Sequence, residues 1–131
     1  MFQYTLNTAK EGFYNITDHV KDAIRRSGII NGICLVYCPH TSAGITINES
    51  ADPDVVKDLL YALNETFPDR PEFRHSEGNS AAHLKSSVIG NSVNLIVANR
   101  TPVLGTWQAI YFTEFDGPRV RKFYIQVIEK A

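Results

Sequence analysis

Beyond residue 86 the chain is almost entirely of β-strand type, and this feature limits its possible folds more than any other. The last strand carries Phe123, Ile125 and Val127 on one face, which is the alternation of a strand that faces a core. We predict four strands in this part of the chain, over residues 87–89, 91–97, 106–115 and 119–129.

The first half of the chain adds four more predicted strands. Phe2, Tyr4 and Leu6 alternate with polar residues, and further strands are expected over residues 13–16, 32–37 and 45–48. Two helices interrupt this series. About eight strands and two helices in this order predict an α+β fold with antiparallel sheets and exclude a doubly wound parallel sheet.

Both helices are predicted from their end signals and apolar spacing. The first starts at Thr17 and Asp18 and ends at Gly28, with Val20, Ala23 and Ile24 on its apolar face and His19 facing solvent. The second starts at Asp52 and Pro53 and is expected to bury a stripe formed by Val56, Leu59, Leu60 and Leu63. A polar loop of residues 69–80 should follow it.

Length and composition favour one soluble domain over residues 1–131. The chain has 131 residues, of which 44% are hydrophobic and 21% charged, with a net charge of −1. This balance gives no field for nucleic acid or an anionic membrane. The polar N-terminus lacks a signal-peptide core and no apolar run approaches the ~20 residues of a membrane span, so a cytoplasmic location is expected.

Two cysteines lie four residues apart in an apolar strand. At about 3.3 Å per residue, the Cα atoms of Cys34 and Cys38 are roughly 13 Å apart, whereas a disulfide needs less than about 7 Å. They are expected to be buried free thiols.

Three histidines form the main candidate site. His40 follows a predicted strand within Pro-His-Thr-Ser-Ala-Gly, and His75 and His83 belong to the segment RHSEGNSAAHLK. Three imidazoles suit Zn²⁺ or another borderline divalent ion and leave a coordination position open for substrate. The alternative is a set of hydrogen-bonded loop histidines without a common ion.

The segments PHTSAGITINE, DPDVVKDL, HSEGNSAAHLK, LGTWQAI and EFDGPRVR resemble, in order and spacing, the YjbQ family, also called the secondary thiamine-phosphate synthase family. This resemblance implies a β-sandwich with flanking helices, a homotrimer and a metal-associated histidine site. It also implies a thiamine-phosphate synthase activity that is secondary to an unsettled physiological reaction. Residues 98–103 depart from the family, which usually has a glycine and a leucine ahead of LGTWQ, and this leaves the substrate preference of that loop open.

Further site residues were assigned around the histidines. Glu49 and Lys85 are the predicted catalytic residues, with Glu49 as a general base or ligand-orienting group, although a solvated carboxylate is the alternative for Glu49. The predicted contacts to substrate or phosphate are Thr41, Ser42, Gly78, Asn79, Thr106, Gln108, Arg119 and Arg121. Arg119 and Arg121 fit equally well as ion-pair partners of Glu114 and Asp116. Trp107 is expected to pack in the core or an interface.

Three functional classes follow from these assignments. The first is a metal-assisted transferase that joins a pyrimidine diphosphate to a thiazole phosphate. The second is a metal-dependent phosphohydrolase, and the third is a metal- or metabolite-binding module without turnover. A phosphorylated small molecule is the expected partner of the first two. Assembly is expected as well, because the last strand also carries Tyr124 and Ile128 on its second face, which needs a cover.

Overall fold

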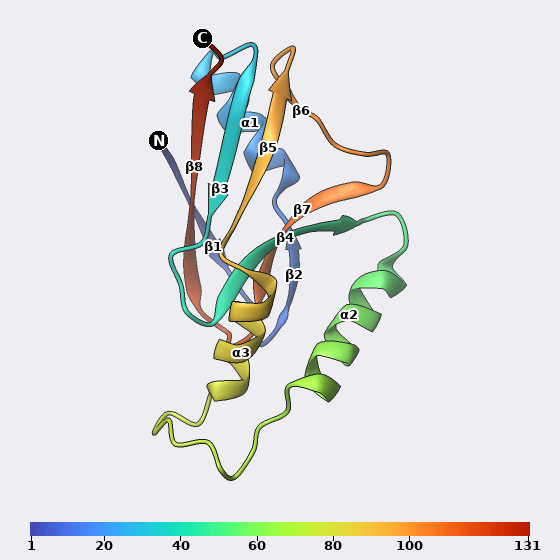
Figure 1. Ribbon diagram of the computed structural model, residues 1–131, viewed down its shortest axis with the longest axis vertical. Helices are drawn as coiled ribbons and strands as arrows, with labels where there is room; N and C mark the ends of the chain where they lie inside the picture. The colour runs from blue at the N-terminus through green and yellow to red at the C-terminus, as the bar shows by residue number, and fades with distance from the viewer.

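The chain folds into a β-sandwich with three helices, and the computed structural model describes all residues 1–131. Figure 1 shows the sheets above a pair of helices, with both chain ends at the same end of the molecule. The strands are β1 (Phe2–Asn7), β2 (Gly12–Asn15), β3 (Gly32–Tyr37), β4 (Ala43–Glu49), β5 (Ser92–Ala98), β6 (Thr101–Pro102), β7 (Gln108–Glu114) and β8 (Val120–Glu129). The helices are α1 (Thr17–Ser27), α2 (Pro53–Thr66) and α3 (Ser80–Ile89).

Two antiparallel sheets form the sandwich. One has the strand order β1-β8-β3-β5-β6 and the other the order β2-β7-β4. Every strand pair is antiparallel, as the order of elements along the chain predicts. The predicted α+β class and sandwich architecture are therefore confirmed, with one helix more than expected.

The core lies between the sheets and under α1. Alternation along β8 buries Phe123 and Ile125, which meet Phe112 of β7 and Ile45 of β4 in one cluster. Val20, Ala23 and Ile24 of α1 are fully buried in the same cluster. The helix ends at Gly28, which adopts the left-handed conformation (φ 72°) that glycine allows without strain.

His19 was predicted to face solvent, but its ring packs against the sheet. Its ring packs edge-on against Tyr4 and Phe123, with ring centres 5.1 and 5.6 Å apart respectively. The helix α1 contacts β8, so His19 is partly covered, whereas its neighbour Asp18 is exposed. Helical spacing alone could not show how far round the helix this contact extends.

The helix α3 replaces a predicted strand. It includes residues 87–89, which were predicted to be a strand, and it starts directly after the long loop. Its buried residues are the small Ala81, Ala82 and Ser86 together with Lys85, so the helix has no stripe of large apolar side chains. This explains why the periodicity of the sequence does not reveal it.

The C-terminal end of α3 is fixed to β4. Ser86 Oγ donates to the carbonyl of Ala43 (2.6 Å), and Ile45 N donates to the carbonyl of Gly90 (3.0 Å). A Cβ atom on Gly44 would lie 2.5 Å from that Gly90 oxygen, so only glycine permits this close approach. These contacts hold the helix beside the segment that contains His40.

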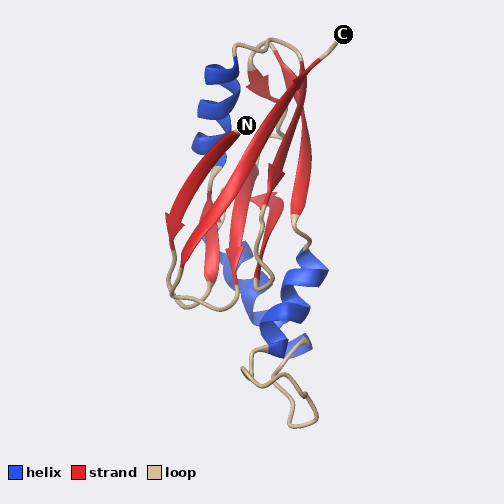
Figure 2. Ribbon diagram, turned by 90° about the vertical axis from the view of Figure 1, so that its left-hand side faces the viewer, coloured by secondary structure: helices blue, strands red, loops and turns tan.

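The helix α2 starts as predicted but does not bury its stripe. Asp52 caps it by accepting from the Asp54 amide (2.9 Å), and Pro53 occupies the first turn. No residue of α2 is buried, because the helix projects away from the sheets (Figures 1 and 2). The predicted burial of its leucine stripe is wrong for the single chain.

The two cysteines are buried, whereas the single tryptophan is exposed. Cys34 and Cys38 are buried free thiols, as predicted, and burial raises the pKa of Cys34 to about 11. Trp107 is 65% exposed, so it does not belong to the core of the chain. None of the three helices has the length and apolar character needed to span a bilayer.

Candidate functional site

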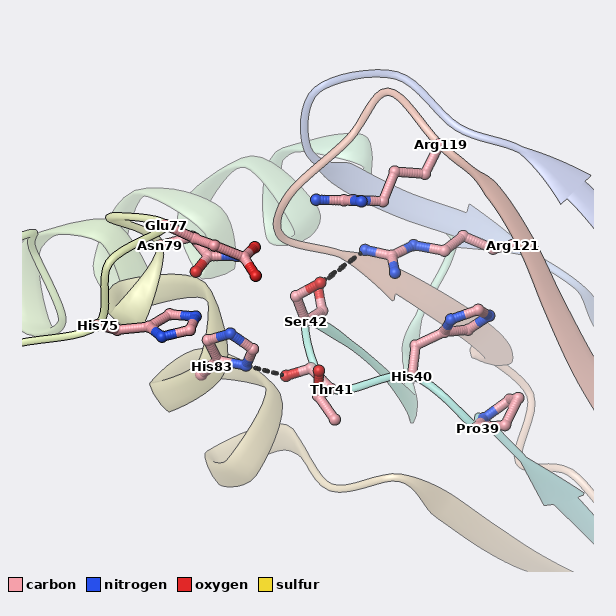
Figure 3. A pocket seen from close by; sticks show the side chains of 10 residues that line it. All are labelled: Pro39, His40, Thr41, Ser42, His75, Glu77, Asn79, His83, Arg119 and Arg121. Carbon is pink, nitrogen blue, oxygen red and sulfur yellow. Dashed lines mark hydrogen bonds between the residues drawn. The ribbon is translucent and has the colours of Figure 1, made fainter.

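A polar pocket of about 530 Å³ lies where three distant segments of the chain meet (Figure 3). The β3–β4 connection, the start of α3 with the loop before it, and the start of β8 each contribute side chains. We call it the histidine pocket, and its lining consists of Pro39, His40, Thr41, Ser42, His75, Glu77, Asn79, His83, Arg119 and Arg121. Eight of these ten residues, including the three histidines, were predicted as site residues from the sequence together with the family resemblance; Pro39 and Glu77 were not.

His83 has a defined tautomer. Its Nδ1 lies 2.8 Å from the carbonyl oxygen of Thr41, which can only accept, so Nδ1 carries the proton. In the neutral tautomer that this contact selects, Nε2 keeps its lone pair, and in Figure 3 this side of the ring faces His75. The ring centres of His75 and His83 are 5.2 Å apart.

His40 lies in the same pocket but is engaged differently. Its Nε2 accepts a hydrogen bond from the Lys122 amide (2.9 Å), so that nitrogen is not free to bind a metal ion. Burial, together with the positive charge of Arg121, holds the pKa of His40 below its ordinary value. His40 is therefore a neutral ring held by the backbone of β8.

The three histidines are not gathered around one point. No group of three or more His, Cys, Asp or Glu side chains in the chain could hold a metal ion. The structure brings His75 and His83 together and keeps His40 apart, so a single chain offers two of the three predicted ligands. Glu77, two residues after His75, also lines the pocket and was not predicted as a site residue.

A buried ionic network around Arg121 lies beneath the pocket, and we call this network the pocket floor. Arg121 forms a two-point ion pair with Glu114 and also donates to Ser42 Oγ (2.9 Å). Thr8 Oγ1 donates to the same carboxylate (2.5 Å). Burial by itself raises the pKa of Glu114, but the hydrogen bonds from Arg121, Thr8 and the Asp116 amide bring it below its ordinary value.

A second, more exposed ion pair lies at the edge of the pocket, and we call it the pocket rim. Arg119 Nη2 donates to Asp116 Oδ2 (2.9 Å), and Asn79 Nδ2 donates to the same oxygen (2.8 Å). Both arginines thus have the ion-pair partners that were the alternative to ligand binding. Because they also line the pocket, the two roles are compatible.

Five predicted site residues lie outside the histidine pocket. Glu49 and Gln108 pair with each other at the far end of β4 and β7, with Thr106 beside them, whereas Ser42 precedes the near end of β4. Lys85 and Gly78 line a different pocket. The sequence motifs place Glu49 soon after His40, but the extended strand β4 carries it away from the histidines.

The whole chain was compared with known proteins. The family model described as UPF0047 protein YjbQ-like matches residues 2–130. The chain belongs to the YjbQ-like UPF0047 family. The YugU protein of Bacillus subtilis is 52% identical over 122 residues, covering 92% of each chain. The MJ1081 protein of Methanocaldococcus jannaschii is 48% identical over 129 residues, covering 98% of this chain and 94% of its own.

Solved structures of the UPF0047 family have the same fold. A crystal structure of the YugU orthologue from Clostridium acetobutylicum has a TM-score of 0.95 at 50% identity, covering 98% of this chain and all of its own. A Sulfolobus solfataricus structure, described as a YbjQ-like protein of unknown function, has a TM-score of 0.93 at 31% identity and covers 98% and 96%.

These comparisons correct the predicted activity. The family and the two curated relatives carry only the UPF0047 designation, and the Sulfolobus protein is of unknown function. The expected thiamine-phosphate synthase activity is therefore wrong as a conclusion from UPF0047 membership. The two alternatives, a phosphohydrolase and a binding module without turnover, gain no support from these relatives.

Proposed function

We propose that the histidine pocket binds a small molecule with an oxyanion group and that His83 removes a proton from that molecule. The observation that carries this proposal is the hydrogen bond between His83 Nδ1 and the Thr41 carbonyl (2.8 Å). It selects, for the neutral ring, the tautomer with the proton on Nδ1 and a lone pair on Nε2, which is the form that a general base requires.

The lining of the pocket supports a polar, oxygen-rich ligand. Apart from Pro39, every lining residue is polar or charged. The hydrogen bonds of Arg119 use Nε and Nη2, which leaves Nη1 for a ligand at the pocket rim. Because Asp116 and Glu114 already balance the two arginines, recognition would depend on directed hydrogen bonds and little on net charge. A phosphorylated or carboxylated metabolite fits this chemistry.

Hydrogen–deuterium exchange into a bound ligand tests the proposal. Phosphorylated and carboxylated metabolites with acidic C–H bonds would be screened for binding by NMR and then followed in D₂O. The wild type should accelerate exchange of a ligand C–H, and His83→Gln should reduce that rate by about 10²-fold or more while the ligand still binds. Lys57→Met, on exposed α2, is the surface control.

Two results would reject this function. The first is that no member of the panel perturbs residues of the histidine pocket. The second is an exchange rate in His83→Gln equal to that of the wild type, which would remove the assigned role of the ring.

A divalent metal ion is a second candidate occupant, favoured by the pairing of His75 and His83. Two imidazoles on one tetrahedral ion have ring centres about 5 Å apart, given Zn–N bonds of about 2.0–2.1 Å. The observed separation of 5.2 Å fits, and histidine ligands commonly donate their second ring nitrogen to a carbonyl, as His83 does. These two residues would hold the ion, which would polarise a ligand oxygen when bound.

Calorimetric titration with Zn²⁺ tests this second candidate. The wild type should bind about one ion per chain, and His75→Ala should weaken binding at least tenfold. His40→Gln is the matched control and should leave the affinity unchanged, because its Nε2 already accepts from Lys122. Equal affinity in the wild type and His75→Ala would remove the ion from this pair.

We further propose that the chain assembles through the outer face of the five-stranded sheet. Ile33, Ile96 and Ile128 of three neighbouring strands are each more than half exposed there, which supports a contact with another copy. A homotrimer is the state implied by the family resemblance. We also propose a cytoplasmic location, as expected from the sequence. Light scattering should give a trimer for the wild type and a monomer for Ile96→Lys. A monomeric wild type would reject it.

A further inference from the structure

A second polar pocket, which we call the lysine pocket, lies on the other face of α3. It has a volume of about 330 Å³ and is lined in part by Asn64, Ala81, Ala82, Lys85 and Phe115. Positions 83 and 85 are roughly 200° apart around a helix of 3.6 residues per turn, so His83 and Lys85 face opposite sides. The lysine pocket is therefore a separate site, and Asn79 is the one residue that it shares with the histidine pocket.

Lys85 is a buried cation without a counter-charge. Lys85 as a whole residue is only 7% exposed. The ammonium donates to Asn64 Oδ1, a neutral acceptor, and forms no salt bridge with any carboxylate. Lysine is almost never buried unless it is paired, because a desolvated charge is costly. Two donor positions of the ammonium remain for a further acceptor.

The N-terminus of α3 supplies further donors to the same pocket. Asn79, at the N-cap position, makes no side-chain cap and instead donates to Asp116. The amides of Ser80 and Ala81 have no acceptor, and Ala81 lines the lysine pocket. Free amides at a helix N-terminus attract anions through their N–H groups and the helix dipole.

Three carboxylates at the pocket wall limit the size of a suitable ligand. Glu11 accepts one hydrogen bond, from Asn64 Nδ2 (3.1 Å), and Asp116 accepts from Arg119 and Asn79. Asp69 is exposed, and Lys10 adds a positive charge at the opening. A small anion can reach the inner donors, whereas a long polyanion would meet these acidic groups.

We propose that the lysine pocket binds a small oxyanion, either a carboxylate or a phosphate group, between the Lys85 ammonium and the first amides of α3. This site is independent of the function proposed for the histidine pocket. The anion supplies the counter-charge that Lys85 lacks and the acceptor that the Ala81 amide lacks.

Amide chemical shifts test this site without the need for an activity. Inorganic phosphate and acetate would be titrated in separate series at constant ionic strength, with chloride as the reference. At least one of the two should shift the Ala81 amide of the wild type to saturation. Lys85→Met should weaken that binding at least tenfold, whereas Lys57→Met should not change it. His83→Gln, on the other face of α3, should not change it either, which separates this site from the histidine pocket.

Three results would overturn the proposal. One is a wild type whose Ala81 amide does not move with phosphate or acetate, a result that is independent of whether Lys85→Met folds. Another is a folded Lys85→Met variant that binds with wild-type affinity. The third is a loss of the Ala81 response in His83→Gln, which would place the anion in the histidine pocket.

Discussion

The floor and the rim of the histidine pocket contain the same kind of interaction in two environments. At the pocket floor, Arg121 and Glu114 are almost fully buried, with 5% and 0% of their side chains exposed. At the pocket rim, Arg119 and Asp116 keep 48% and 30% exposed. Water screens the outer pair much more than the inner one, so removal of one partner should have very different energetic consequences at the two places.

This difference assigns distinct tasks to the two arginines. Arg121 is fixed by Glu114 and Ser42, and it holds together β7, β8 and the segment before β4. The side chain of Arg119 is held by Asp116 alone and stays about half exposed, so its free Nη1 can contact a ligand. The floor therefore sets the shape of the pocket, and the rim is free to respond to what binds there.

The strongest test of this comparison is removal of the buried carboxylate. Glu114→Gln leaves Arg121 buried without its partner, so we expect a loss of about 3–5 kcal/mol in the free energy of unfolding at pH 7, measured with urea. Asp116→Asn, the matched change at the rim, should cost about 1 kcal/mol or less. Similar losses in the two variants would break the comparison.

The pH dependence of this contribution has a definite sign. The pKa of Glu114 in the folded chain is lowered from its ordinary value of 4.5. A lowered folded pKa stabilises the fold fully above the unfolded pKa, and the contribution is lost as the pH falls through the folded pKa. The stability difference between wild type and Glu114→Gln should thus be constant above about pH 5.5 and shrink below pH 4.5.

Removal of one hydrogen bond at the floor should have an intermediate effect. Ser42→Ala takes away the hydroxyl that accepts from Arg121 Nη2 at 2.9 Å. We expect a loss of about 1–3 kcal/mol in the free energy of unfolding, since the lost partner belongs to a buried charge. Thr41→Ala, which keeps the carbonyl that His83 uses, is the neighbouring control. A loss as small as that of the control would mean that Ser42 does not support Arg121.

A smaller effect is expected from His40, and it appears only with changing pH. Because the pKa of the folded ring is lowered from 6.5, the unfolded chain binds more protons just below that pH. The free energy of unfolding should therefore decrease as the pH falls from about 6.5, and His40→Gln should remove this slope. Parallel pH profiles of the two proteins between pH 7.5 and 5.0 would contradict the assigned state of His40.

The smallest change in stability is expected at the rim. Arg119→Ala should alter the free energy of unfolding by about 0–1 kcal/mol, because its ion pair is exposed. Its affinity for an oxyanion ligand in the histidine pocket should fall by about tenfold. A large loss of stability with unchanged ligand binding would show that Arg119 is structural.

The sequence predicts the sandwich well because strand alternation is a local property. The strand β3 spans Gly32–Tyr37 as expected, and β8 buries Phe123 and Ile125 as its alternation indicates. The helix α3 leaves no such record, since it packs through Ala81, Ala82 and Ser86, where backbones approach closely. Small residues carry little hydrophobic signal, so a helix that packs through them resembles a loop in sequence.

The candidate site could be predicted only in part for the same reason. The motif residues around His40 and His83 do meet, as the shared pocket shows. Without the helix, the direction of Lys85 could not be known, and it was assigned to the histidines instead of the opposite face. The hydrogen bond from Lys122 to His40 joins residues 82 positions apart, and no local pattern contains it.

The close contact between Gly44 and Gly90 also determines how α3 can move. Its C-terminal end lies so close to β4 that a Cβ atom on Gly44 would be 2.5 Å from the Gly90 oxygen. Hydrogen bonds from Ser86 and Ile45 hold this end in place. Any rotation of the helix against the sheet must pivot about that end and displaces the N-terminal turn most. Asn79 and Ala81 lie on that turn, where the two pockets adjoin. The two pockets are therefore mechanically linked, because displacement of that turn moves lining residues of both.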